Sequence, residues 1–172
     1  MKTLIIIPSR LAASRLPGKP LLKINGLSII SHVFKKAEKA KIGDVLVATE
    51  NQEIVDDVKK NGGEAVLTSN KHNTGTDRIY EALQKTKIPK IDLVMNLQGD
   101  EPLIDVNDIR NLNQLMMDTN SKIGTLASKI LDKKFYDNQS VVKVKTKEEL
   151  DHKNFPEAIY FKRKTQKKDL NI

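Results

Sequence analysis

The chain has 172 residues, a length that suits a single domain with a sizeable apolar core. It contains no cysteine, which excludes disulfides, zinc–thiolate sites and thiol nucleophiles. The formal net charge of +8 suits an anionic small substrate or a nucleic acid, but much of the excess lies in residues 162–168. The apolar run at the N-terminus is too short for a signal peptide or a membrane span, so we expect a cytoplasmic protein without a membrane partner.

Apolar runs typical of buried strands alternate with helical periodicity along most of the chain. They predict strands at residues 2–7, 44–49, 64–67 and 91–97, and helices at residues 28–41, 51–58, 76–83 and 106–117. An Asn-Gly turn is expected at residues 25–26. Residues 124–130, 140–145 and 158–161 are also predicted as strands, without full helices between them. We therefore expect an α/β fold with a doubly wound, mostly parallel sheet, a mixed second half and no linker between domains.

A cationic loop, residues 8–20, follows the first predicted strand. Arg10 and Arg15 can form forked hydrogen bonds to phosphate oxygens, and Lys19 adds a compact charge. The Gly-x-x-x-x-Gly-Lys-Ser/Thr pattern of a P-loop is absent, so side chains would hold phosphate as much as backbone amides. Taken alone, the loop is equally compatible with a surface turn that carries solvated cations.

Three polar loops follow predicted strands and are expected at the same edge of the sheet: residues 9–20, 68–78 and 98–102. The third loop carries two carboxylates, Asp100 and Glu101. Taken alone, this Asp-Glu-Pro segment is more typical of a capped turn. Opposite the cationic loop, Asp100 becomes the better candidate for a ligand of a hard cation such as Mg²⁺, which bridges phosphates.

No acid–base or nucleophilic set is visible in the sequence. The three histidines, His32, His72 and His152, form no HExxH pattern and no evident Ser-His-Asp arrangement, and of these only His72 lies in a loop expected near a ligand. This fits phosphoryl or nucleotidyl transfer, which depends on positioning, metal and cations more than on a covalent catalyst.

Several segments together closely resemble the 3-deoxy-manno-octulosonate (KDO) cytidylyltransferase family, the CMP-KDO synthetases. The long opening block, Ile7-Pro8-Ser9-Arg10-Leu11-Ala12-Ala13-Ser14-Arg15-Leu16-Pro17-Gly18-Lys19-Pro20-Leu21, is followed in order by residues 47–49, 62–63, 72–78, 96–102, 141–144 and 158–161. The resemblance covers most of residues 1–161. It implies a Rossmann-like nucleotidyltransferase (GT-A-like) three-layer sandwich that forms CMP-KDO and pyrophosphate from CTP and KDO with Mg²⁺, for lipopolysaccharide synthesis.

The resemblance also implies the site residues. The catalytic set would be Arg10, Arg15, Lys19 and Asp100, with Asp100 holding Mg²⁺. The substrate-binding set would be Pro8, Ser9, Arg10, Ser14, Arg15, Lys19, Thr74, Gly75, Arg78, Gln98 and Arg163. Family members form homodimers, and we expect this dimer to be weakened here if the C-terminal segment of the family is absent. No nucleic-acid partner is expected.

The end of the chain departs from the family pattern. Lys162 stands where the family has Ser, and the Pro-rich run that follows in the family is missing. Family members continue for several tens of residues beyond the position that corresponds to Ile172. We therefore expect a C-terminally incomplete cytidylyltransferase domain at residues 1–161 and a disordered basic tail at residues 162–172. Three functions remain open: an active enzyme, for KDO or another acid sugar; an impaired relative that still binds CTP; and a basic nucleic-acid-binding protein, whose affinity would fall steeply with salt.

Overall fold

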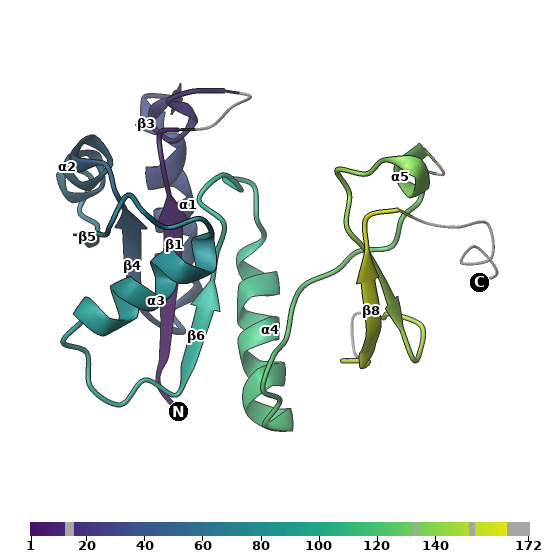
Figure 1. Cartoon of the computed structure of the whole chain (residues 1–172). Coiled ribbons are helices and arrows are strands. Elements are labelled where there is room, and N and C mark those ends of the chain that lie inside the picture. The colour runs from purple at the N-terminus through teal and green to yellow at the C-terminus, as the bar shows by residue number, and fades with distance from the viewer. Residues whose placement is uncertain (13–15, 133, 152–153, 165–172) are drawn as a thin grey trace. The chain divides into compact units, whose positions relative to one another are not determined.

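The computed structural model describes residues 1–12, 16–132, 134–151 and 154–164 (Figure 1). Its contacts group into two compact units, residues 1–122 and the chain from residue 123 onward. The sequence predicts no such boundary. A single cytidylyltransferase domain over residues 1–161 stays a prediction.

The first unit is built on a parallel sheet whose central strand is β1. The strand order is β5-β4-β1-β6, with bounds Ala65–Leu67, Gly43–Thr49, Thr3–Ser9 and Leu93–Asn96. β1 pairs with β4 along its whole length and with β6 from Thr3 to Ile6. The four predicted strands are thus confirmed, and their spatial order, 3-2-1-4 in chain sequence, is that of a doubly wound sheet.

Helices cover both faces of this sheet. Three of them lie on one face: α1 (Ile29–Ala40), α2 (Gln52–Lys60) and α4 (Val106–Thr119). α3 (Gly75–Lys85) lies on the other and crosses in front of the strands in Figure 1. Alternate β1 residues divide between the two cores, Ile5 and Ile7 with α1 and Leu4 and Ile6 with α3. Burial on both faces explains why the β1 sequence is continuously apolar, and it confirms the three-layer α/β sandwich.

Side chains at the helix starts explain where the helices begin. Ser28 and Thr74 accept hydrogen bonds from the amides of Ser31 and Asp77, and thereby cap α1 and α3. Asp105 caps α4 as predicted, by accepting from the Asn107 amide. α3 begins one residue before the predicted start, since Thr74 is the capping residue.

Two short elements follow the cationic loop. The 3-10 helix η1 (Lys19–Leu21), which the sequence analysis did not predict, leads into the hairpin of β2 (Lys23–Ile24) and β3 (Leu27–Ser28). Both turn residues of this hairpin have positive φ, 50° at Asn25 and 81° at Gly26, as in the expected Asn-Gly turn.

The second unit contains the short helix α5 (Lys134–Asp137) and an antiparallel pair, β7 (Lys143–Thr146) with β8 (Ala158–Lys162). The last two predicted strands are therefore confirmed, although they form a separate sheet rather than extending the parallel one. The predicted strand at residues 124–130 is wrong. These residues are mostly exposed and pair with no strand among the described residues, and β-forming side chains do not make a strand without a partner.

In the parts of the chain that the structure describes, no helix has the length and apolar character needed to cross a membrane.

One buried hydrogen bond joins the central strand to α4. The Thr3 hydroxyl donates to Asn113 Oδ1 at 2.7 Å, and both side chains are buried. We expect Thr3→Val to lower the free energy of unfolding by about 1–2 kcal/mol, because Asn113 Oδ1 loses its donor in the core. Replacing both partners, in Thr3→Val/Asn113→Leu, should recover part of the loss in urea unfolding. A double variant less stable than Thr3→Val would contradict this account.

Candidate functional site

Three loops at the carboxyl edge of the parallel sheet line a cleft of ≈ 330 Å³. It lies between the neighbouring parallel strands β1 and β6, where the strand order of the sheet reverses, which is the point at which doubly wound sheets bind ligands. The lining residues are Pro8, Ser9, Arg10, Lys19, Pro20, His72, Asn73, Thr74, Gly75, Arg78, Gln98, Gly99 and Asp100. The structure thus brings together parts of all three loops that the sequence analysis placed at one edge.

Most of the predicted site residues line this cleft. Ser14 and Arg15 lie outside the described residues. Arg163 belongs to the second unit, where its guanidinium donates to the backbone carbonyls of Gln139 and Ser140, each at 3.3 Å. The remaining predicted residues are cleft-lining: Pro8, Ser9, Arg10, Lys19, Thr74, Gly75, Arg78, Gln98 and Asp100.

Four cleft residues were not in the predicted site set: Pro20, His72, Asn73 and Gly99. Each lies one or two positions from a predicted residue in one of the three loops. Treating each loop as a whole, rather than selecting some of its members, would have identified them.

An ion pair joins the first and third loops. Lys19 Nζ lies 2.7 Å from Asp100 Oδ2. Gly18, with a φ of 71°, turns the chain into η1 and so directs Lys19 toward the cleft. Gly99 permits the close approach on the other side, since a Cβ there would lie 2.9 Å from the Pro8 carbonyl oxygen.

The end of β1 offers polar groups that have no partner among the residues described by the structure. Ser9 Oγ is buried and has no hydrogen-bond partner among the described residues. Next to it, Arg10 is exposed, and its guanidinium makes no hydrogen bond or ion pair within the described part of the chain. Since buried hydroxyls normally find a partner, these two residues are available to a ligand or to water.

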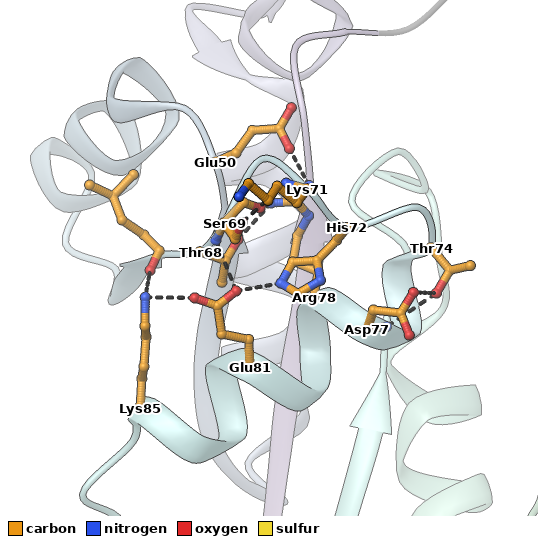
Figure 2. A network of polar contacts seen from close by, with 11 residues as sticks. Glu50, Thr68, Ser69, Lys71, His72, Thr74, Asp77, Arg78, Glu81 and Lys85 are labelled. Carbon is orange, nitrogen blue, oxygen red and sulfur yellow. Dashed lines mark hydrogen bonds and ion pairs between the residues drawn. The ribbon is translucent and has the colours of Figure 1, made fainter.

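Arg78 has a different environment. Its side chain is buried, donates to Thr68 Oγ1 at 2.6 Å and to the Ser69 carbonyl at 3.4 Å, and forms an ion pair with Glu50 (Figure 2). Arg78 therefore ties the second loop to the end of β4. Its predicted contact with a ligand stays a prediction.

Glu81 is the second anchor of the same loop (Figure 2). Its carboxylate pairs with Lys85 at 2.7 Å, accepts from the Ser69 amide at 2.8 Å and contacts His72 Nε2. Lys85 also donates to the Leu67 carbonyl at 2.8 Å. Lys85 first, then the Ser69 amide and His72, lower the pKa of Glu81 to about 2. The network fixes the loop that continues into Thr74 and places His72 at the cleft.

The start of α3 adds a favourable position for an anion. Thr74 and Gly75 line the cleft at the N-terminus of this helix, where backbone amides and the helix dipole attract negative charge. Together with Arg10 and Lys19, this gives the cleft donors and cations from two separate loops.

A metal ion would find one carboxylate in the cleft lining. Asp100 offers a hard oxygen, but no group of three or more His, Cys, Asp or Glu among the described residues could hold a metal ion by itself. The donor set therefore fits an Mg²⁺ that takes most of its ligands from water and a bound phosphate, as this ion commonly does.

A model of the family described as Cytidylyltransferase matches residues 4–170. The chain is 49% identical over 143 residues to the 3-deoxy-manno-octulosonate cytidylyltransferase of Afipia carboxidovorans, covering 83% of this chain and 58% of that protein. The enzyme of the same name from Haemophilus influenzae is 42% identical, covering 85% and 58%. A solved structure described as CMP:2-keto-3-deoxy-manno-octonic acid synthetase complexed with CTP superposes with a TM-score of 0.78 at 35% identity, covering 95% of this chain and 65% of that one. These findings confirm the resemblance, and the chain spans less than two thirds of these curated relatives.

The lowered pKa of Glu81 predicts a specific acid dependence of stability. Its contribution should be complete above the ordinary carboxyl pKa of 4.5 and be lost as the pH falls toward about 2. Glu81→Gln should therefore unfold at a lower temperature than the wild type near pH 7, and this difference should narrow with acidification. Glu38→Gln, on the exposed face of α1, is the matched control. A Glu81→Gln deficit that stays constant between pH 6 and pH 2.5 would contradict the assignment.

Proposed function

Because this chain belongs to the cytidylyltransferase family, we propose that it transfers the cytidylyl group of CTP to KDO and releases pyrophosphate. The observation that carries the proposal is the cleft at the switch point of the sheet, which is lined by Arg10, Lys19 and Asp100 and in which Lys19 pairs with Asp100. The names of the similar enzymes and the CTP complex among the similar structures support the choice of nucleotide and sugar.

The reaction needs a nucleophile, a leaving group and charge stabilisation. The sugar hydroxyl oxygen forms a bond to the α-phosphorus and loses its proton, while the bond from that phosphorus to the bridging oxygen breaks. Pyrophosphate leaves with the electron pair. Lys19 and Arg10, together with Arg15 outside the described residues, would hold the triphosphate and offset the negative charge that grows on the leaving group.

The cofactor that fits this donor set is Mg²⁺. Asp100 would hold it, with phosphate oxygens and water as the other ligands. When bound, the ion would neutralise phosphate charge and help to orient the triphosphate. The protein's part is to supply the carboxylate on a rigid turn, since Gly99 packs against the end of β1.

The remaining residues would bind the substrates. The start of α3, at Thr74 and Gly75, and the Ser9 hydroxyl would meet the nucleotide. Arg78 and Gln98, whose amide donates to Asn96 Oδ1 at 3.1 Å, would lie at the junction of nucleotide and sugar. Arg163 would meet the acid sugar. In this proposal the protein acts in the cytoplasm as a homodimer, in the pathway that supplies lipopolysaccharide with activated KDO.

A second candidate function is CTP binding without turnover. The described lining of the cleft comes from residues 8–100 of the first unit, and Arg163, proposed for the acid sugar, belongs to the second unit. The names of the similar enzymes support the full reaction rather than this alternative.

Pyrophosphate release with CTP, KDO and Mg²⁺, alongside calorimetry with CTP, separates these functions. We expect Asp100→Asn to lower kcat by about 100-fold or more, because the metal loses its carboxylate, and EDTA to abolish turnover. Asp108→Asn, exposed on α4, should act like the wild type. CTP binding without pyrophosphate release would select the second candidate. Absence of both would overturn the proposal.

A further inference from the structure

The Lys19 ammonium is paired with Asp100, the carboxylate that is proposed to hold Mg²⁺. Lys19 Nζ lies 2.7 Å from Asp100 Oδ2, which is a direct ion-pair contact. The pair links the loops that leave β1 and β6, so it spans the cleft at the switch point of the sheet.

Lys19 and a divalent cation would repel each other if both were bound to Asp100 Oδ2. Mg²⁺ binds carboxylate oxygens at about 2.1 Å, which would put it only a few ångströms from an ammonium that is itself in contact with the same atom. Two positive charges so close repel each other, so each weakens the binding of the other. Lys19 and the metal therefore compete for Asp100.

The side chains can exchange partners without a rearrangement of the loops. The Lys19 and Asp100 side chains are 33% and 56% exposed, and exposed ion pairs are weak. The backbone beneath Lys19 is held in η1, where the Leu21 and Leu22 amides donate to the carbonyls of Gly18 and Lys19 at 2.9 and 3.1 Å. Rotation of the flexible lysine stem is thus sufficient to move the charge.

We propose that Lys19 is the resident counter-ion of Asp100 and yields this carboxylate to the divalent cation when a triphosphate draws the ammonium away. Nucleotide and metal then bind cooperatively, because the nucleotide removes the competitor of the metal. In the nucleotide-free protein the pair also neutralises Asp100 and keeps the metal affinity low. The inference rests on the proposed function for the nucleotide and for Asp100 as a ligand of the divalent cation.

The test measures Mn²⁺ binding to the nucleotide-free protein by electron paramagnetic resonance. Lys19→Met and Lys19→Gln should each bind Mn²⁺ about tenfold more tightly than the wild type, within the usual range of coupling between sites. Lys23→Met, which removes an exposed lysine from β2, is the control for the change in net charge and should leave the affinity unchanged. Adding Asp100→Asn to Lys19→Met should remove the gain.

Two results would overturn the proposal. One is a Mn²⁺ affinity of both Lys19 variants within twofold of the wild type, with thermal unfolding showing that they are folded. The other is a gain that persists in Lys19→Met/Asp100→Asn, which would place the metal elsewhere. Neither measurement requires CTP. Failure of wild-type CTP binding in calorimetry would count against the proposed function instead.

Discussion

Burial of β1 on both faces is the constraint on which the first unit depends. Leu4 to Ile7 are fully buried, so each face of this strand requires its own layer of helices. Covering both faces requires crossover connections, and these keep β4, β5 and β6 parallel to β1. Parallel strands end at one edge of the sheet, and the loops after β1, β5 and β6 therefore converge there. The apolar run at residues 4–7 therefore determines where the cleft lies, although none of these residues lines it.

The three loops are held at this edge by different interactions. Close packing at Gly99 sets the third loop against β1, and η1 sets the first. The second loop depends on α3, because Arg78 and Glu81 reach back from this helix to the segment that precedes it. Since the same helix begins at the cleft with Thr74, one element both anchors the loop and offers its N-terminus to a ligand.

Local chemistry made much of this predictable. Capping residues such as Ser28 and Asp105 and the continuous apolar run of β1 act within a few residues, so the sequence alone was enough to locate those elements. The sequence did not reveal which residues far apart in the chain contact each other. The apolar residues at 124–130 are not a strand because nothing among the described residues pairs with them, and Arg78 bonds to Glu50, 28 positions away. Strand pairing and long-range ion pairs depend on the tertiary fold, which cannot be derived from the local pattern of one sequence.

Burial separates the charged residues of the family-like segments into two kinds. Arg78 is buried with its charge paired, whereas Arg10 is exposed without a partner among the described residues. Removing a partner from a buried ion pair is costly, so Arg78 stabilises the framework of the cleft, whereas the described residues hold no such contact for Arg10. Lys19 lies between these cases, because its partner, Asp100, is itself a candidate ligand of the metal. The family-like segments therefore contain residues that stabilise the cleft, such as Arg78, and residues available to a ligand, such as Arg10. Their burial and hydrogen-bond partners in the structure distinguish the two kinds.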